Sequence, residues 1–577
     1  MNKFTSKICN NFANHLYWWI FGIVAVYTSC DIIFTYLRFN LLFYVDTDCY
    51  THASRIIYWL QNFSWYEQIY PFGNPPSGEI LHFTRLMDVI WVALSLPFIP
   101  FFPLKDAVFY SGMLISPLCL ALSLITVFWG LKPYLKQTSK ILFFSLTISL
   151  FFLIRVYWVF DFARPDHHSI IFLFFAYNIS AVLQNLSKER FRTLFFAGIL
   201  AGCGIWISSA VEGFILTASI LSLLSLNWLF GKLSLKHLQL YSLGLFCATA
   251  AAFLLNPPYG GYFEFDNTRL SLFHVVITLL ICLSFYILAL FKPQKSIAKI
   301  IGGLCCTLVS IAVIYKIFGF SVIFAPIYKT EAKQFFLPYV TEMMPLWHFS
   351  YLLKIMAFEI ILTLLVLFYN PQKTKSVNLN LAFLAAFFFV PALIAVRFIP
   401  YELCVFAYLN TIFINRLFSS ENLTKFDKCL AFDYICAALF LLASFQYKET
   451  YPLKSQEIPQ NSIVLTNTFD APQLIFDRDA KTVAIPYHTA AAGIADNHKI
   501  LFSSDETEIK KLLQKHQVEY IFMAVSSYKN SKYYVSPEQN TAKFYGKIIT
   551  GKQVYPWLQK IDLDSKDILY KVNYQEF

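Results

Sequence analysis

The sequence predicts a polytopic α-helical membrane protein that carries a small extracytoplasmic α/β domain at its C-terminus. Of its 577 residues, 57% are hydrophobic and only 14% are charged, whereas soluble domains contain about 25% charged residues. The mean hydropathy of +0.54 therefore indicates a chain that lies largely in lipid. The net charge of +11 comes from short Lys and Arg clusters between apolar runs. Bilayers orient proteins by such clusters, so the charge does not indicate a partner nucleic acid.

About thirteen segments are apolar and long enough to be transmembrane helices, since a bilayer-spanning helix needs about 20 such residues. The first has no small-residue cleavage site after it, and we expect a retained signal anchor. The candidate spans are 16–36, 107–131, 140–159, 169–185, 193–210, 211–230, 238–255, 271–291, 298–318, 349–369, 379–397, 399–417 and 428–446.

A further apolar run, 87–103, is ambiguous. Pro97, Pro100 and Pro103 would damage its helix interior. If it lies on the membrane surface and the N-terminus is cytoplasmic, every short basic loop faces the cytoplasm, as the positive-inside rule requires. These loops carry Lys132, Lys136, Lys140, Lys188, Arg190, Arg192, Lys232, Lys236, Lys292, Lys295, Lys299, Lys373, Lys375, Arg416, Lys425 and Lys428.

The polar tail is expected on the opposite, outer face. Asp505–His516 reads as a helix with Ser503 or Ser504 as its N-cap. Short strands are predicted at Ser462–Asn467, Thr482–Pro486 and Val518–Ala524. We therefore expect a transmembrane catalytic domain over 1–446, with outer loops 37–106 and 319–348, followed by an outer α/β domain over 447–577.

Two predicted outer loops contain groups suited to a metal ion. Asp46 and Asp48 flank a single residue just after the first span, and closely spaced hard oxygen ligands suit a divalent cation. Asp166, His167 and His168 follow the third span, and carboxylate with imidazole suits a transition metal. The alternative for the second group is a polar cap for a helix that begins near Ser169.

Two more charged residues fall at outer boundaries of spans. Glu342 lies just before the tenth span, where a carboxylate could merely complement a helix dipole. Arg397 ends the eleventh apolar run. It could snorkel to the headgroups, or hold a phosphate through its planar guanidinium.

One topology places all of these groups on the same side of the membrane. Carboxylates and an imidazole can then hold one divalent ion, with an arginine beside them for a phosphate. This constellation favours sugar transfer from a polyprenyl phosphate or diphosphate, because metal and guanidinium both offset the charge that develops on the leaving phosphate.

The outer-face motifs resemble the catalytic subunit of oligosaccharyltransferases, within the class C membrane glycosyltransferases. The first loop contains "DCYTHASRIIYWL" and "IYPFGNPP", and the second motif, "RPDHH", matches the family's Asp-His-His form. The last long loop ends in "YVTEMMP", although its Thr is displaced to Thr341, and Arg397 precedes a Phe as in the family. The resemblance covers roughly 16–446.

This resemblance implies thirteen membrane helices, an outer-face active site and an Mn²⁺ or Mg²⁺ ion. It implies Asp48, rather than Asp46, as the first metal ligand, together with Asp166, His168 and Glu342. Asp48, Glu342 and Arg397 would be catalytic. The expected substrate contacts are Asp46, Arg55, His167 and Arg397.

The tail departs from the family, because no Trp-Trp-Asp motif is present and "YPWLQKID" does not match it. The acceptor is therefore open among a glycan, a lipid and a protein, including true protein oligosaccharyl transfer. His488 and His498 are expected to be structural. Charged residues within or at the ends of spans are Asp31, Glu212, Lys354, Glu359 and Asp433, and Lys354 and Glu359 are expected to pair.

The alternative from another class is a transporter or flippase for the lipid-linked sugar. Transporters often contain internal repeats with broken helices at the midplane, and no repeat is visible here. An inactive scaffold would be favoured by a broken ligand set. An O-antigen-ligase-like or O-linked transferase would share the chemistry and differ in its acceptor. The bacterial inner membrane is the expected location.

The charge pattern predicts a cytoplasmic N-terminus and an extracytoplasmic chain from residue 447 onward. Alkaline phosphatase, which is active only outside the cytoplasm, should therefore be active when it is fused after Tyr447. A fusion at the same position that is active only with a cytoplasmic reporter would contradict this topology.

Overall fold

The computed structural model describes residues 15–135, 145–150, 159–209, 211–323, 328–368, 374–419, 452–524, 541–553, 555–563 and 565–577. Ten described helices are long and apolar enough to cross a membrane, and one shorter apolar helix, α8, accompanies them. The protein is an integral multi-pass membrane protein, as the composition predicts. The helices are α2 (Leu16–Phe39), α5 (Leu104–Leu131), α7 (His167–Ser187), α8 (Phe191–Ile207), α9 (Glu212–Leu229), α10 (Leu235–Leu255), α11 (Leu272–Phe291), α12 (Ser296–Ile323), α14 (Ser350–Phe368), α15 (Lys375–Ile394) and α16 (Ile399–Ser419).

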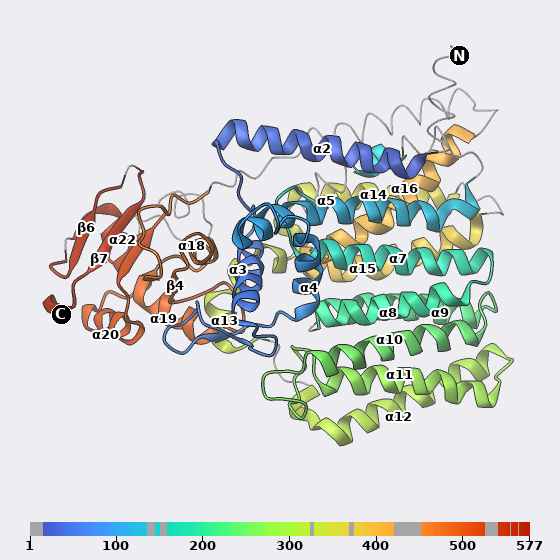
Figure 1. Ribbon diagram of the computed structural model, residues 1–577. Coiled ribbons are helices and arrows are strands. Elements are labelled where there is room, and N and C mark those ends of the chain that lie inside the picture. Colours follow the sequence, from blue (N-terminus) through green and yellow to red (C-terminus); the bar gives the residue numbers. More distant parts are fainter. Residues whose placement is uncertain are drawn as a thin grey trace, which may run out of the picture.

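Each of these helices coincides with a predicted span to within a few residues. Of predicted span 140–159, only 145–150 and 159 are described, and 428–446 lies outside the described residues. The helices run side by side, whereas α3 (Thr47–Asn62) and α4 (Arg85–Ser95) cross one end of the bundle (Figure 1). With 11 residues, α4 is too short to span a bilayer, so the ambiguous run 87–103 is not a span.

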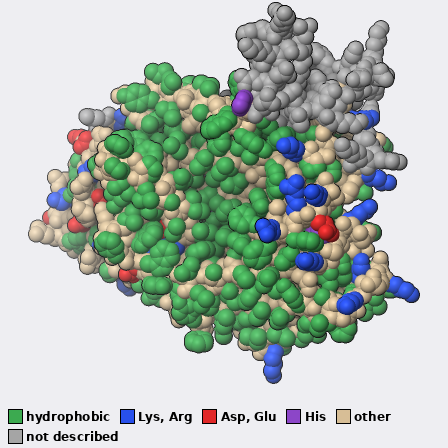
Figure 2. All heavy atoms as spheres, turned by 45° about the vertical axis from the view of Figure 1, so that its right-hand side comes forward, with side chains coloured by type: hydrophobic (Ala, Val, Ile, Leu, Met, Phe, Trp, Pro, Cys, Tyr) green, Lys and Arg blue, Asp and Glu red, His purple; other side chains and the backbone are tan. Residues whose placement is uncertain are grey.

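The two ends of the bundle differ in charge. The turns after α5, α7, α9 and α11 all lie at the end away from α3 and α4 (Figure 1). Figure 2 shows Lys and Arg side chains gathered on one side of an otherwise apolar surface. The exposed basic residues in or beside the turns after α5, α7, α9 and α11 include Lys132, Lys188, Arg190, Arg192, Lys232, Lys236, Lys292 and Lys295. The one-sided placement matches the predicted basic loops, while the cytoplasmic identity of that face remains a prediction.

Small residues bring α8 and α10 into close contact near the middle of the bundle. A Cβ on Gly198 would collide with the carbonyl oxygen of Tyr241, and one on Gly244 with that of Phe195. Glycines allow backbones to approach closely in a membrane. The pairing fixes the end of α8, where Ser208 leads into the turn before α9.

The tail forms a mixed α/β domain around a five-stranded sheet with order β4-β3-β5-β7-β6. β3 (Ile463–Leu465) pairs in parallel with β4 (Lys481–Thr482) and β5 (Tyr520–Met523), while β7 (Ile568–Val572) pairs antiparallel with β5 and β6 (Leu558–Ile561). Two of the predicted strands form in shortened form, as β3 and β5, whereas β4 shares only Thr482 with the predicted strand Thr482–Pro486. Helices accompany the sheet: α18 (Ala471–Arg478), α19 (Ala491–Phe502), α20 (Glu506–His516) and α22 (Phe544–Thr550).

The N-cap of α20 was predicted wrongly. Asp505, rather than Ser503 or Ser504, caps this helix through a hydrogen bond from the backbone N–H of Thr507. Ser503 instead accepts from the backbone N–H of Asp505. An Asp at this position also has a charge that the helix N-terminus favours.

The long loop between α2 and α5 is docked onto the tail by backbone pairing. The Thr482 N–H donates to the Phe72 carbonyl at 2.8 Å, and the Asn74 N–H donates to the Thr482 carbonyl at 2.9 Å. Gly73 thereby forms a parallel bridge to Thr482, beside the edge strand β4. Buried His516 adds a contact of 2.8 Å from its Nδ1 to the carbonyl oxygen of Pro75. The loop therefore extends the sheet of the tail and protects its edge.

Glu79, in the short strand β2 (Glu79–Ile80), lies in the same interface. Its Oε1 accepts from the backbone N–H of Gly493 at 3.3 Å, and burial raises the pKa of Glu79 to about 7 from an ordinary 4.5. The unfolded chain releases this proton at lower pH than the folded chain does. Docking stability should therefore fall as the pH rises from about 4.5 to about 7.

Glu79→Gln should remove this pH dependence, because the amide keeps an acceptor for Gly493 and cannot ionise. At about 1.4 kcal/mol per pH unit between the two pKa values, the variant should be more stable than the parent by up to about 3 kcal/mol at pH 8. At pH 4.5 the two should be equal. Thermal unfolding of the full chain in detergent at both pH values measures this, with exposed Glu457→Gln as the matched control. Parallel pH profiles for Glu79→Gln and the parent would contradict the assignment.

Candidate active site

Asp46 and Asp48 open helix α3 and have different environments. Asp46 is the N-cap, because its extended backbone lets Oδ1 accept from the Asp48 N–H at 3.3 Å. Its Oδ2 lies 2.9 Å from a guanidinium nitrogen of Arg164. Burial raises the pKa of Asp48 well above its ordinary value, and the nearby carboxylates of Asp46, Asp166 and Glu342 raise it further. Asp48 thus faces three other acidic side chains, whereas Asp46 has the helix cap and a cation as partners.

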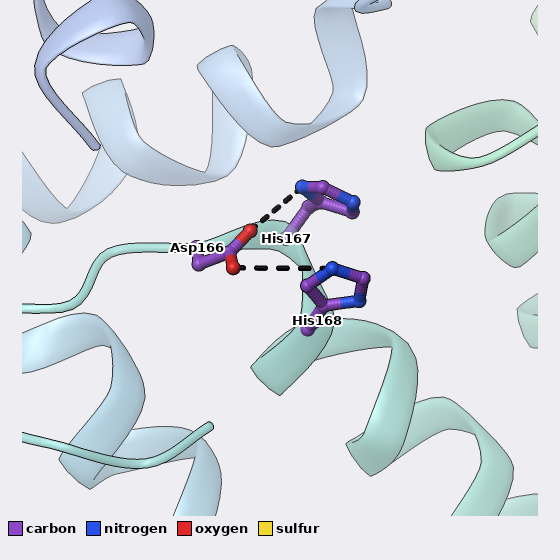
Figure 3. A group of neighbouring side chains, drawn as sticks. All are labelled: Asp166, His167 and His168. Carbon is purple, nitrogen blue, oxygen red and sulfur yellow. Dashed lines mark ion pairs between the residues drawn. The ribbon is translucent and has the colours of Figure 1, made fainter. Parts of the chain in front are cut away.

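The three residues Asp166, His167 and His168 converge at the start of α7 (Figure 3). Their potential ligand atoms all lie within 4.8 Å of one another. Asp166 Oδ1 is 2.7 Å from His167 Nδ1, and Asp166 Oδ2 is 4.0 Å from His168 Nε2. All three side chains are buried. Asp166 occupies the N-cap position but makes no side-chain capping bond. A mere polar cap does not explain this carboxylate, which points at the imidazoles.

Glu342 reaches the same point from the long loop between α12 and α14. Its Oε2 lies 3.4 Å from His168 Nε2. Burial would raise its pKa, but His168 and the charge of Arg397 lower the pKa of Glu342 to about 2. It lies in a single 3-10 turn, Thr341–Met343, several residues before α14. Complementing the dipole of that helix is therefore not its role here.

Arg397 follows α15 in another 3-10 turn, Val396–Phe398. One terminal nitrogen lies 3.1 Å from Oε2 of Glu212, and the side chain is 15% exposed. The other terminal nitrogen is 3.7 Å from the Met343 sulfur. A snorkelling arginine would extend into the headgroup region, so this alternative is wrong for Arg397.

Glu212 belongs to the site although its sequence position offered only a general signal, a charge at the end of a span. Its Oε1 is 3.1 Å from His168 Nδ1 and accepts from the Tyr401 hydroxyl. Its Oε2 accepts from Ser208 Oγ at 3.0 Å and from Arg397. The predicted pair of Lys354 and Glu359 does not form, because Lys354 is exposed and both buried oxygens of Glu359 lack a hydrogen-bond partner among the described residues.

These groups surround a cavity of about 430 Å³ between the bundle and the tail. Residues from the tail complete its wall, including Tyr487 and His488, so His488 lies at the site rather than remote from it. The His82 and His488 rings lie 4.6 Å apart. Burial lowers the pKa of both, that of His488 to about 4, so both rings are neutral. The cavity lining includes Asp46, Asp48, His82, Arg164, His167, Glu212, Tyr328, Glu342, Arg397, Tyr487 and His488.

Arg55 is placed differently from its predicted role as a substrate contact. Its guanidinium is buried, pairs with Asp88 of α4 and donates to the Thr84 carbonyl at 2.6 Å. Arg55 does not line the cavity. The pair joins α3 to α4, which is the reason that α3 presents Asp48 at a fixed position. His498 also lies elsewhere, stacked between Phe335 and Phe502.

No protein-family model and no curated protein matches this sequence. Solved structures do match. The archaeal oligosaccharyltransferase AglB from Archaeoglobus fulgidus, in complex with an inhibitory peptide and dolichol-phosphate, has a TM-score of 0.68 and 14% identity, over 95% of this chain and 80% of that chain. The chain shares the fold of this archaeal enzyme.

Two further structures of the Archaeoglobus fulgidus oligosaccharyltransferase are similar to this chain. One is tethered to an acceptor peptide with the NVT sequon, with a TM-score of 0.67, 14% identity, and coverage of 98% of this chain and 75% of that chain. The other, a complex with Zn and sulfate, has a TM-score of 0.59, 14% identity, and coverage of 84% and 65%. At 14% identity the likeness shows the fold, so the chemistry has to be argued from the residues of this chain.

Proposed function

We propose that this protein is a metal-dependent membrane glycosyltransferase that moves a sugar or oligosaccharide from a polyprenyl phosphate or diphosphate to an acceptor at the outer face of the membrane. One observation carries the proposal. Asp48, Glu342 and Arg397, from three separate parts of the chain, line one cavity beside Asp166 and His168. A bacterial inner membrane is the setting we propose.

The donor set fits a divalent cation. Asp48, Asp166, His168 and Glu342 supply oxygen and imidazole nitrogen, and the potential ligand atoms of Asp166, His167 and His168 lie within 4.8 Å of one another. The mutual repulsion that raises the pKa of Asp48 is what a bound cation would relieve. Mn²⁺ and Mg²⁺ both suit this set. When bound, such an ion neutralises charge that builds on the phosphate of the donor.

Arg397 is the group proposed to hold the donor phosphate. It lines the cavity from the end of α15, and Glu212 and the Met343 sulfur fix its guanidinium. A planar guanidinium can meet two phosphate oxygens, which lysine cannot do. The lipid tail would remain beside the bundle while the sugar lies in the cavity. The dolichol-phosphate and the sulfate in the archaeal structures support an anionic donor group in this fold.

The wall formed by the tail and by the loop before α4 suits the sugar. His82 Nδ1 and His488 Nε2 are buried without hydrogen-bond partners among the described residues, and a neutral imidazole can both donate to and accept from hydroxyl groups. Phe83 and Tyr487 lie beside them with ring centroids 4.9 Å apart. Aromatic faces and neutral imidazoles are suited to bind a hydroxyl-bearing sugar ring, whereas Arg397 is suited to bind the phosphate.

The acceptor is a glycan, a lipid or a protein. The acceptor peptide in the archaeal structure supports protein oligosaccharyl transfer for this fold, whereas the missing Trp-Trp-Asp motif favours a different acceptor here. A flippase is the competing function, because the fold has a large cavity at the end of a helix bundle. A flippase function does not explain why Asp166 and Glu342 both lie beside His168 Nε2.

Mass spectrometry of surface glycans, glycolipids and glycoproteins from a strain that lacks the gene tests the proposal. One class of glycoconjugate should disappear, and the lipid-linked donor should accumulate at the outer face. Complementation with Asp48→Asn should restore less than roughly 1% of this glycoconjugate. Even the loss of a residue that only supports a metal ligand lowers metal affinity or activity by about 10–100-fold.

The matched control is Asp106→Asn, which changes an exposed carboxylate in the first turn of α5 and should restore the glycoconjugate fully. Full restoration by Asp48→Asn would contradict the proposal. A donor that accumulates only at the cytoplasmic face would instead favour the flippase.

A further inference from the structure

Glu212 is a buried carboxylate between the two halves of the proposed site. It is 1% exposed at the start of α9, and each of its oxygens faces a different functional group. Oε1 lies 3.1 Å from Nδ1 of His168, on the side of the ligand cluster. Oε2 lies 3.1 Å from a terminal nitrogen of Arg397, the residue proposed to bind the donor phosphate. A charge at this depth is costly unless it is compensated, and these two contacts supply the compensation.

The contact with Oε1 selects the tautomer of His168. A carboxylate only accepts hydrogen bonds, so Nδ1 of His168 carries the hydrogen that it donates to Glu212. The lone pair of neutral His168 is then on Nε2, the atom that faces Asp166 at 4.0 Å and Glu342 at 3.4 Å. Carboxylates that hold the second nitrogen of a ligand histidine orient the ring and raise its basicity.

The contact with Oε2 restrains Arg397. The Ser208 hydroxyl, from the end of α8, donates to the same oxygen at 3.0 Å, and the Tyr401 hydroxyl donates to Oε1. Glu212 is therefore bound by groups from α7, the turn after α8, the turn before α16, and α16 itself. A change at Arg397 alters the charge compensation that Glu212 receives. Because His168 contacts the same carboxylate, the change also reaches His168.

We propose that Glu212 is a positioning residue that couples the binding of metal to the binding of phosphate, through the contacts His168–Glu212–Arg397. The inference rests on the proposed function. A phosphate at Arg397 shares the guanidinium and leaves Glu212 with less compensation. Glu212 then accepts more strongly from His168 Nδ1, and Nε2 becomes a better ligand. By linkage, bound metal strengthens phosphate binding by the same factor.

The test measures Mn²⁺ affinity from the electron paramagnetic resonance signal of free Mn²⁺, on the full chain in nanodiscs. Titrations are run with and without inorganic sulfate, a tetrahedral dianion that stands in for phosphate, at ionic strength matched with chloride. In the parent, sulfate should tighten Mn²⁺ binding by about 5-fold or more, the scale of an allosteric coupling. Glu212→Gln should weaken Mn²⁺ alone by about 10–100-fold and reduce the sulfate effect to below about 2-fold.

Glu359→Gln is the matched control, because Glu359 is equally buried within α14 and lies outside the cavity lining. It should match the parent in both titrations. Tyr401→Phe provides a second variant if Glu212→Gln does not fold. It removes the hydroxyl that shares Oε1 with His168, so Mn²⁺ binding should become tighter by roughly 2-fold or more, and an unchanged affinity would count against the inference.

The outcomes separate the two proposals. If the parent does not bind Mn²⁺, the proposed function fails and the coupling fails with it. If Asp48→Asn abolishes Mn²⁺ binding while Glu212→Gln matches the parent, the metal site stands and the inference is overturned. A weakened Mn²⁺ affinity in Glu212→Gln with an undiminished sulfate effect would likewise overturn the coupling.

Discussion

Uncompensated negative charge at the end of a membrane bundle is the constraint on which the rest of this structure depends. Asp46, Asp48, Asp166, Glu212 and Glu342 crowd into one region of low polarity, where unpaired charges are expensive. Arg164 pairs with Asp46 and Asp166, and Arg397 pairs with Glu212. Asp48 faces the cavity with no ion pair to a basic side chain among the described residues, whereas Glu342 lies 3.4 Å from His168. The arrangement is one that a cation and an anionic donor would complete together.

The remainder of the fold holds this arrangement in place. The buried pair of Arg55 and Asp88 joins α3 to α4 and so orients Asp48. Backbone pairing between the α2–α5 loop and β4 brings the tail over the cavity. An apolar cluster that includes Tyr70, Phe336 and Ile485 packs this loop and the α12–α14 loop against the tail. The α/β domain is therefore a wall of the site, from which Tyr487 and His488 reach the same space as Asp48.

Much of this could be predicted from the sequence, because bilayers impose strong patterns. Apolar length revealed the spans, and the clusters of Lys and Arg excluded 87–103 as a helix that crosses the membrane. Motifs around Asp48, Asp166, Glu342 and Arg397 identified residues that the structure brings together. Glu212 was visible only as a charge at the end of a span, since its partners lie far away in the chain. The sequence could not predict that His82 and His488 lie side by side, because their proximity depends on how the tail docks. Arg55 was misassigned, because an arginine that forms a buried ion pair and an arginine that contacts substrate look the same in the sequence.

The location of a bound metal tests the central claim most directly. Anomalous diffraction from crystals of the full chain soaked with Mn²⁺ should show a single strong peak between Asp48, Asp166, His168 and Glu342. Ligand distances should be about 2.0–2.6 Å. A strong peak between His82 and His488, or no peak at saturating Mn²⁺ in crystals that leave the cavity open, would contradict the account.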